Sequence, residues 1–304
     1  MIKAVLKTIA RKLGHIYQVV NKESEDIKLL ALGRLLANQQ QLLKSDNFND
    51  YEFKIFSEWG DDGLIQHLIK RIAIPNQTFI EFGVEDYMES NTRFLLMNNY
   101  WSGFVMDGSE RNMRSLRSRS WFFKYDLRCK AAWIDRDNVN ALIAESGWAD
   151  IGILHIDLDG NDYFILKELD FSSIRPAILI LEYNSLFGPE REISVPYDSK
   201  FYRTRAHYSN LFFGASLGAL TLEADRKGYS LIGCNNAGNN AYYVRNELLG
   251  SQSTCTVQNA FKLNKFRQGR KPDGQFSFLT RDQEIELIRG MEVLNVRTGQ
   301  IEKF

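Results

Sequence analysis

The fold is decided by the stretch from Thr78 to Asp107, which contains the runs Thr78-Phe-Ile-Glu-Phe-Gly-Val-Glu85 and Trp101-Ser-Gly-Phe-Val-Met-Asp107. Each run is apolar and ends in an acidic residue, Glu81 in the first and Asp107 in the second. A polar loop and a short helix-forming segment separate them. The pattern predicts a strand, a turn, a helix and a second strand, with an acid at the tip of each strand.

This unit is suited to hold a nucleoside. Gly83 permits a tight turn at which the backbone approaches a ligand, and a carboxylate at the second tip can accept hydrogen bonds from ribose hydroxyls. Glu81 and Asp107 stand 26 positions apart in the sequence. That is close to the spacing of roughly 20 in dinucleotide-binding folds. Only one glycine of a G-x-G-x-x-G motif is present, which argues against a plain NAD-type Rossmann site.

Strands and helices are predicted to alternate through the following 140 residues or so. We expect further strands at Trp121–Leu127, Ile151–Asp159 and Ala177–Tyr183, separated by helices. Near-continuous apolar strands are typical of a parallel sheet covered on both faces, which indicates a doubly wound α/β domain.

The sheet is predicted to end in a hairpin. Tyr229–Cys234 and Ala241–Arg245 are separated only by the amide-rich turn 235–240, which is too short for a parallel crossover. We therefore expect an antiparallel last strand. This distinguishes the fold from a dehydrogenase, whose sheet would stay parallel.

We divide the chain into a helical N-terminal extension (1–50), the α/β domain (51–248) and a small α+β C-terminal segment (249–304). Within 1–20, apolar residues recur at helical spacing among basic ones. This segment either contacts an anionic membrane surface or a partner, or packs on the domain or pairs subunits in a homo-oligomer. The cations between 262 and 271 suggest either a site for an anionic acceptor or a solvated face.

Composition excludes several classes of protein. The 304 residues include 38 Lys and Arg and 38 Asp and Glu, so no overall charge favours nucleic acid. Three cysteines without C-x-x-C spacing fit a reducing compartment. No apolar run reaches the roughly 18 residues of a transmembrane span. We expect a cytoplasmic protein.

Taken together, these features resemble class I S-adenosylmethionine-dependent methyltransferases, which have a seven-stranded Rossmann-like sheet with an antiparallel last strand. The resemblance covers roughly residues 54–248. The phrases Glu81-Phe-Gly-Val-Glu, Ser90-Asn-Thr-Arg-Phe-Leu-Leu, His155-Ile-Asp-Leu-Asp-Gly-Asn-Asp162 and Glu182-Tyr-Asn184 are similar to FkbM-like members of that family. Those members are associated with O-methylation of sugars or polyketides and with surface-polysaccharide biosynthesis. Glu85, Tyr87 and Met88 replace glycines that the broader family has after its first strand.

The resemblance implies that S-adenosyl-L-methionine is the cofactor. The family carries acids at the tips of strands 1 and 2 and often after strand 3, and a glycine after strand 1. Carried over to this sequence, the expected cofactor contacts are Glu81, Gly83, Asn91, Thr92, Asp107, Gly108 and Asp126.

A second set of polar residues follows the fourth and fifth strands. In one interpretation, Asp159, Glu182 and Asn184 bind Mg²⁺ or Mn²⁺, since hard cations prefer oxygen ligands. In another, a carboxylate or His207 is the general base that removes a hydroxyl proton. In a third, Asp159 to Asp162 forms only a turn and a helix cap. His155, inside the strand, is expected to be a core residue.

His207 lies in the long polar segment 189–210, which is more typical of a substrate lid than of a plain connection. Our candidates for catalysis are therefore Asp159, Glu182 and His207. The resemblance implies an O-methyltransferase acting on a sugar, glycan or similar small hydroxyl acceptor. Two alternatives stay open: a non-catalytic scaffold that has kept the fold, and a nucleotide-sugar or NAD enzyme.

Overall fold

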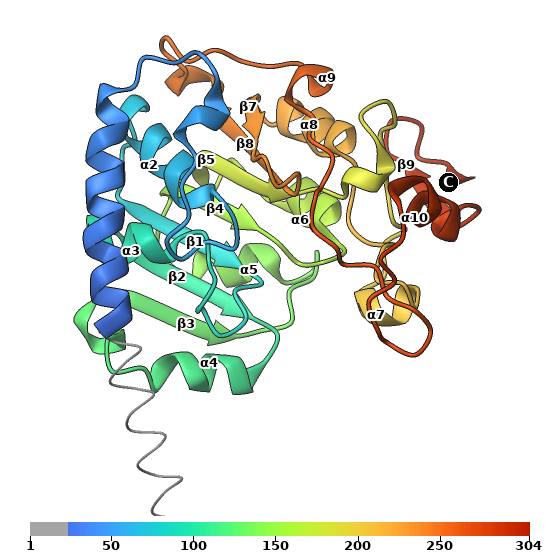
Figure 1. Ribbon diagram of the computed structural model, residues 1–304, viewed down its shortest axis with the longest axis horizontal. Coiled ribbons are helices and arrows are strands. Elements are labelled where there is room, and N and C mark those ends of the chain that lie inside the picture. Colours follow the sequence, from blue (N-terminus) through green and yellow to red (C-terminus); the bar gives the residue numbers. More distant parts are fainter. Residues whose placement is uncertain (1–23) are drawn as a thin grey trace, which may run out of the picture.

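The computed structural model describes residues 24–304 of the chain, so the predicted basic segment 1–20 lies outside the described residues. A seven-stranded sheet forms the centre (Figure 1). Its strands follow the order β3 (Leu127–Ala131), β2 (Ser102–Asp107), β1 (Thr78–Phe82), β4 (Asp150–Ile156), β5 (Arg175–Glu182), β8 (Asn240–Arg245) and β7 (Tyr229–Cys234).

The sheet has the predicted mixture of strand directions. Strands β1 to β5 are parallel to one another, whereas β8 is antiparallel to both β5 and β7. The turn 235–240 is the short connection that forces this reversal. The fold is therefore the doubly wound, Rossmann-like α/β fold with an antiparallel last strand that the sequence predicted.

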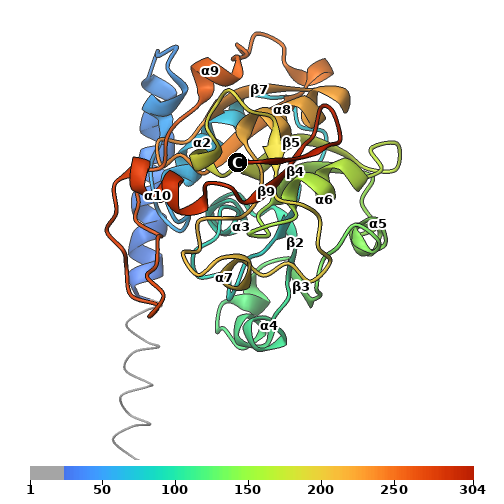
Figure 2. The same ribbon diagram turned by 90° about the vertical axis from the view of Figure 1, so that its right-hand side faces the viewer.

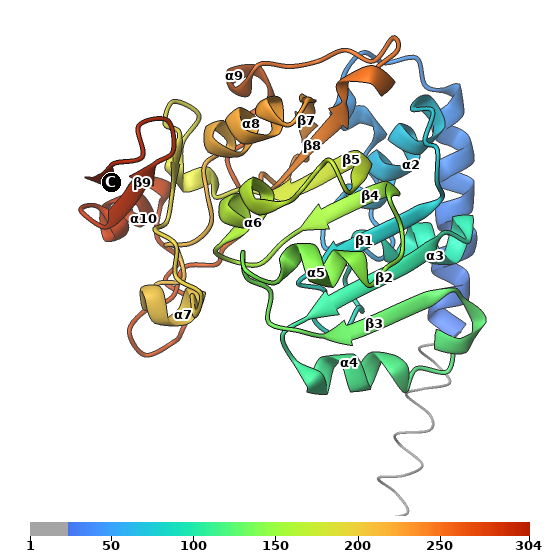
Figure 3. The same cartoon turned by 180° about the vertical axis from the view of Figure 1, so that it is seen from behind.

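Helices cover both faces of the sheet, as Figure 3 shows from behind. One face packs against α5 (Val139–Ala144), α6 (Asp162–Glu168) and α8 (Leu217–Arg226). The other packs against α2 (Asp61–Arg71), α3 (Arg93–Asn99) and α4 (Glu110–Arg117). Both layers bury aliphatic and aromatic side chains, which explains why the central strands read as continuous apolar runs.

The N-terminal part is folded onto the domain. A helix spans residues 24–39 and is followed by the short helices η1 (Gln40–Leu42) and η2 (Phe48–Tyr51). Asp26 forms an ion pair with the buried Arg93 at 2.5 Å. The segment Asn47–Tyr51 is also packed on the domain, because the Phe48 ring lies edge-on against Tyr242 of β8.

The C-terminal segment builds a second, three-stranded sheet. Strands β9 (Glu292–Asn295) and β10 (Ile301–Lys303) form a terminal hairpin, and β9 also pairs with β6 (Ile193–Ser194). The remaining elements are η3 (Phe122–Lys124), η4 (Ser185–Phe187), α7 (Arg203–Ala206), η5 (Asn246–Leu248), α9 (Val257–Ala260) and α10 (Arg281–Ile288). Figure 2 looks onto the carboxyl ends of the central strands, with α7, α10 and β9 in front of them.

One predicted strand is wrong. Trp121–Leu127 forms a turn and η3 instead, and the strand starts at Leu127 and continues to Ala131. Leu127-Arg-Cys-Lys-Ala131 lies at the edge of the sheet and keeps polar side chains partly exposed, so it lacks the apolar run of a buried strand.

Candidate functional site

The carboxyl ends of β1, β2, β4 and β5 meet at one edge of the sheet, where open α/β folds bind ligands. Gly83, Asp107, Asp157 and Glu182 follow or end these strands. Strand β8 begins at the same edge, because it is antiparallel, and Asn240 stands directly opposite Glu182. The predicted site residues of strands 1, 2, 4 and 5 are thus brought together.

Glu81 is buried, and its carboxylate is engaged by groups of the protein. Its Oε1 accepts hydrogen bonds from the Asn91 backbone N–H at 3.1 Å and from the His155 ring at 2.9 Å. Its Oε2 accepts from the Ser90 hydroxyl and from the backbone and hydroxyl of Thr92. Five donors exhaust the roughly four lone-pair sites of a carboxylate. The structure therefore places Glu81 and Thr92 in the support of the loop and leaves Glu81 no acceptor capacity for a cofactor.

Glu81 and His155 form a buried ion pair. Burial by itself would raise the pKa of Glu81, but the hydrogen bond and positive charge of His155 hold it below its usual value. Burial likewise opposes charging of His155, and the Glu81 carboxylate overcomes it and raises the pKa of the imidazole. The expectation that His155 is a core residue is confirmed by its burial, and its role is to fix Glu81 and, through it, the residues 90–92.

The loop after β1 keeps a backbone that glycine favours, even where glycine is absent. Gly83, Glu85 and Tyr87 have φ angles of +75°, +47° and +63°. For Glu85 and Tyr87 such angles cost about 1–2 kcal/mol each. Strain of this kind persists where the surroundings enforce it and is concentrated at ligand sites. Tyr87 is held by burial and by a 2.8 Å hydrogen bond to Thr92.

Asp107 ends β2 and holds the segments that follow β1 and β2 by hydrogen bonds. Its Oδ2 accepts the Glu85 backbone N–H at 3.0 Å, and its Oδ1 accepts from the Ser109 backbone and the Asn112 amide. Oδ2 keeps one lone pair for a further donor. A Cβ at Gly108 would lie 3.1 Å from the ring of Trp133, so this aromatic side chain borders the same tip.

Asp126 lies at the amino end of the strands, so the prediction that it follows β3 at the carboxyl edge is wrong. It precedes β3 and accepts a 2.5 Å hydrogen bond from the hydroxyl of Ser102, which is the first residue of β2. Because β2 runs from Ser102 to Asp107, the two acids are separated by the length of the strand.

Three carboxylates form a cluster after β4 and at the end of β5. One oxygen from each of Asp157, Asp159 and Glu182 lies within 4.8 Å of the others, and no other group of this kind occurs in residues 24–304. Burial and the charge of Asp159 raise the pKa of Asp157 to about 7. Burial, then the charge of Asp157, raises the pKa of Glu182 well above its usual value. Glu182 Oε2 is buried and has no hydrogen-bond partner.

Asn184 does not join this cluster, which corrects the predicted ligand set. Its amide donates to the carbonyls of Leu211 and Phe213, and its oxygen accepts the Leu186 backbone N–H. Asp157 occupies the third position instead. Asp162 has the predicted turn role, because its carboxylate accepts the backbone N–H groups of residues 158 and 160.

Part of the segment 189–210 covers the Asp159 loop. Arg203 donates to Asp159 Oδ1 and to Gln268, and its guanidinium lies 3.6 Å from the centre of the Phe213 ring. The Asn161 amide donates to the Asp198 carbonyl, and Phe201 packs directly on Gly160. The same segment also contacts Trp133, which lies beside Gly108 after the end of β2.

Two aromatic residues that the sequence analysis did not identify, Trp133 and Tyr202, form this second contact. Trp133 donates a 2.7 Å hydrogen bond to the Ser199 carbonyl and stacks on Tyr202, with ring planes 7° apart. Trp133 follows β3, and a correct boundary for that strand would have identified it. Both rings remain about half exposed.

His207 contacts neither Asp159 nor Glu182. Its Nδ1 is 2.7 Å from the Ser209 hydroxyl, its ring packs on Tyr208, and partial burial lowers its pKa. His207 therefore belongs to the segment 189–210, part of which covers the Asp159 loop.

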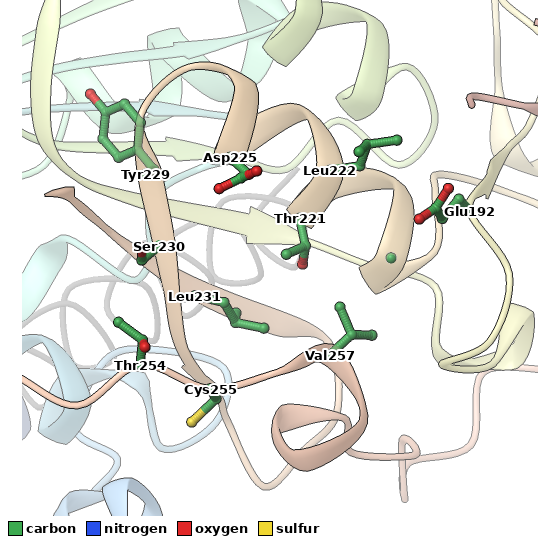
Figure 4. A pocket seen from close by; sticks show the side chains of 11 residues that line it. Glu192, Thr221, Leu222, Asp225, Tyr229, Ser230, Leu231, Thr254, Cys255 and Val257 are labelled. Carbon is green, nitrogen blue, oxygen red and sulfur yellow. The ribbon is translucent and has the colours of Figure 1, made fainter. Parts of the chain in front are cut away.

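A surface hollow of about 310 Å³ lies elsewhere, between α8, β7 and α9 (Figure 4). Thr221, Asp225, Tyr229 and Cys255 are among its lining residues. It contains none of the residues at the carboxyl edge and no cluster of carboxylates, so we do not assign it to the functional site.

Within residues 24–304, no helix combines the length and the hydrophobicity needed to cross a bilayer. The chain matches no protein-family model, and no curated protein matches it significantly.

Among solved structures, the chain is similar to the N-terminal domain of EvdMO1, crystallised in the presence of SAH and D-fucose (12% identity, TM-score 0.39, 69% of this chain and 94% of that chain). It is also similar to an O-methyltransferase from Bacillus cereus in complex with SAH (13%, 0.40, 72% and 89%). A third is an S-adenosylmethionine-dependent methyltransferase from Clostridium acetobutylicum (10%, 0.39, 60% and 88%). At these identities and TM-scores, the assignment of the fold rests on the strand order itself.

Proposed function

We propose that the protein is an S-adenosylmethionine-dependent methyltransferase. One observation carries this proposal: the strained loop 83–87 and Asp107 share the carboxyl edge with the cluster of Asp157, Asp159 and Glu182. A loop suited to a nucleoside would therefore stand beside groups able to handle the proton of an acceptor. Methyl transfer requires this adjacency, since donor and acceptor must be held in line.

The residues of the edge fit the donor. Asp107 has acceptor capacity left for a ribose hydroxyl, and the backbone of the loop 83–87 permits close approach. After burial, the charges of Asp107 and Asp159 contribute most to raising the pKa of Glu85, so negative charge is concentrated here. Such a region favours a cationic ligand. S-adenosylmethionine would supply an electrophilic methyl group on its sulfonium.

The acceptor we propose is a hydroxyl of a sugar or glycan, as the sequence resemblance to FkbM-like methyltransferases of surface-polysaccharide biosynthesis implies. Glu182 Oε2 and Asn240 Oδ1 are both buried without a partner, and the two residues stand opposite each other in the β5–β8 ladder. Side chains opposed in this way lie on the same face of a sheet. Two unpartnered polar oxygens on one face suit a ligand with several hydroxyl groups, each of which can donate or accept a hydrogen bond.

We propose further that Asp157, Asp159 and Glu182 hold Mg²⁺ or Mn²⁺. The three oxygens are close enough to share one ion, Oε2 of Glu182 lacks a partner, and carboxylates are the ligands that these cations prefer. The ion would lower the pKa of the acceptor hydroxyl.

Calorimetric titration of the full chain with Mn²⁺ tests the metal site. We expect one ion per chain, and a loss of affinity of at least about tenfold in Glu182→Gln. Glu190→Gln is the matched control, because Glu190 is exposed and lies outside the cluster. Equal affinity in all three proteins would refute this ligand set.

The methyl-transfer reaction itself is tested with S-adenosylmethionine labelled in its methyl group. The full chain is incubated with a panel of sugars and glycan precursors, and the label is followed into the acceptor by mass spectrometry. We expect transfer by the wild type and a loss of at least about a hundredfold in Glu182→Gln. Donor binding without transfer to any hydroxyl acceptor would count against the acceptor class and favour a non-catalytic scaffold.

A further inference from the structure

Most of the cations between positions 262 and 271 lie on a hairpin, residues 265–279, which we call the basic hairpin. Its two arms are joined by an antiparallel bridge between Arg270 and Phe276, and the Lys271 N–H donates to the Gln275 carbonyl at 2.8 Å across the turn. In Figures 1 and 3 it belongs to the orange-red chain between α9 and α10 that passes alongside α7. The side chains of the hairpin are thus held on an ordered backbone.

The basic hairpin carries a local excess of positive charge. It contains four cations and one acid, Asp273, and so has a net charge of +3, although the whole chain has a net charge of zero. Lys265, Arg267 and Lys271 are exposed, and Arg270 is partly buried. Among the residues that the structure describes, none of the four cations forms an ion pair with an acidic side chain. Exposed positive charge without an internal partner favours an anionic ligand.

Two exposed aromatic rings lie beside these cations. The Arg270 guanidinium lies 3.8 Å from the centre of the Phe276 ring, and the Arg267 guanidinium lies 5.8 Å from that of Phe278. Phe276 and Phe278 are 41% and 68% exposed, and Phe278 has a φ of +53°, which is unfavourable for a bulky residue. Strained backbone is concentrated at ligand sites. Exposed ring faces beside guanidinium groups suit a ligand that combines a sugar ring with a phosphate or a carboxylate.

The basic hairpin is connected to the carboxylate cluster through the segment 189–210. Gln268 accepts a hydrogen bond from Arg203, and the same guanidinium donates to Asp159. The Arg270 backbone N–H donates to the Ser209 carbonyl at 3.0 Å. A single side chain, that of Arg203, therefore spans the space between the hairpin and Asp159.

A second connection leads from the hairpin to the proposed acceptor residues. The Phe266 ring stacks on Trp59, with ring centres 5.0 Å apart. Asp61 lies two positions after Trp59 and accepts a 3.1 Å hydrogen bond from the Asn240 amide. Asn240 stands opposite Glu182 in the sheet. The basic hairpin thus borders the acceptor side of the carboxyl edge.

We propose that the basic hairpin binds an anionic group of the acceptor, a phosphate or a carboxylate carried by the glycan, while Phe276 and Phe278 pack against one of its sugar rings. This inference rests on the proposed function, because the same glycan presents its hydroxyl to Glu182. Asp157, Asp159 and Glu182 repel an anion, so the anionic group lies at the hairpin and only the neutral hydroxyl enters the carboxyl edge. A long polyanion such as nucleic acid is a poorer ligand, because it would extend from four cations over these acids.

Binding of defined oligosaccharides to the full chain, measured by calorimetric titration, tests the proposal. The probes are maltotetraose, maltotetraose phosphorylated at its reducing end, and the tetramer of galacturonic acid. We expect at least one of the two anionic probes to bind at least about tenfold tighter than maltotetraose at about 0.05 M salt, and to lose most of this advantage at about 0.5 M salt. Comparison of the two anionic probes distinguishes a phosphate from a carboxylate.

Variants separate the charged and the aromatic contributions. Arg267→Gln with Lys271→Gln should reduce the preference for the anionic probe at least about fivefold, because two of the four cations are removed. Lys28→Gln with Lys44→Gln is the matched control, since it removes two exposed cations outside the hairpin, and should keep the wild-type preference.

Phe278→Asn tests the aromatic contact. Asparagine tolerates the positive φ at this position, so the backbone of the hairpin is kept. We expect this variant to bind the neutral and the anionic probes more weakly by about the same factor, because the ring face is lost and the cations remain.

Three results would overturn the proposal. They are no preference of the wild type for either anionic probe, an equal loss of preference in the Lys28→Gln/Lys44→Gln control, or tighter, hairpin-dependent binding of a single-stranded oligonucleotide or of phosphatidylglycerol vesicles. The last result would assign the hairpin to a nucleic acid or to a membrane surface. S-adenosylhomocysteine binding, measured on the same proteins, reports separately on the proposed function: its absence in the wild type would contradict methyl transfer, whereas the preference for an anionic glycan is measured without it.

Discussion

Replacing Gly83 by Ala tests the geometry on which the site depends. A Cβ at this position would lie 1.7 Å from the carbonyl oxygen of Asp157, and the φ angle is +75°. The obstacle is backbone and cannot swing away as a side chain could. Either the loop after β1 or the segment that carries Asp157 must move, and both belong to the proposed site.

Gly147 provides the matched control. Its φ angle of +73° is almost the same, but a Cβ there would meet nothing within 4 Å. Gly147→Ala should therefore lower the free energy of unfolding by only about 1 kcal/mol, the conformational cost alone. Gly83→Ala should lower it by roughly 3–4 kcal/mol, because the steric conflict is added to that cost.

Urea denaturation followed by far-ultraviolet circular dichroism measures both free energies. The folded Gly83→Ala protein should also bind S-adenosylhomocysteine at least about tenfold more weakly, while Gly147→Ala binds normally. If the two variants were destabilised equally, the close approach of loop and strand would be refuted.

Two further predictions concern buried groups. Glu81→Gln should lower the free energy of unfolding by roughly 3 kcal/mol, because it removes the charge that pairs with His155, and urea denaturation measures this; a loss below about 0.5 kcal/mol would contradict the pairing. Burial, and then the neighbouring cations Arg71 and Lys70, lower the pKa of His67 to about 4, so the folded state keeps this ring neutral while the unfolded chain takes up a proton near pH 6.5. Stability should therefore be unaffected by His67 above pH 6.5 and fall by roughly 2 kcal/mol as the pH drops to 4. In His67→Gln that part of the acid sensitivity should disappear, and an unchanged pH profile would show that His67 is not its source.

The sequence was informative wherever a strand is buried. Apolar runs and the short turn 235–240 predicted the order of elements and the final antiparallel strand, because burial on both faces leaves a clear pattern. The edge strand β3 has no such apolar pattern. The apolar residues Trp121-Phe-Phe123 were therefore mistaken for the strand, and Asp126 was placed at its wrong end. Residues that follow a misplaced strand, such as Trp133, were missed for the same reason.

The direction of a side chain at a strand tip was harder to predict. Glu81 and His155 lie on adjacent strands in register, so their pairing consumes a carboxylate that the sequence assigned to the cofactor. Two-residue periodicity does place Asp157 on the same face as His155, which is the signal that favours it over Asn184 as a member of the cluster. The contacts that occupy Asn184 come from Leu211 and Phe213, far away in the sequence, and no local pattern reveals them.

The most direct test of the central claim is calorimetric titration of the full chain with S-adenosylhomocysteine, with NAD⁺ as the competing ligand. Our account predicts one S-adenosylhomocysteine per chain, a loss of at least about tenfold in affinity for Asp107→Ala, and no binding of NAD⁺. Failure to bind S-adenosylhomocysteine, or preferential binding of NAD⁺, would contradict it.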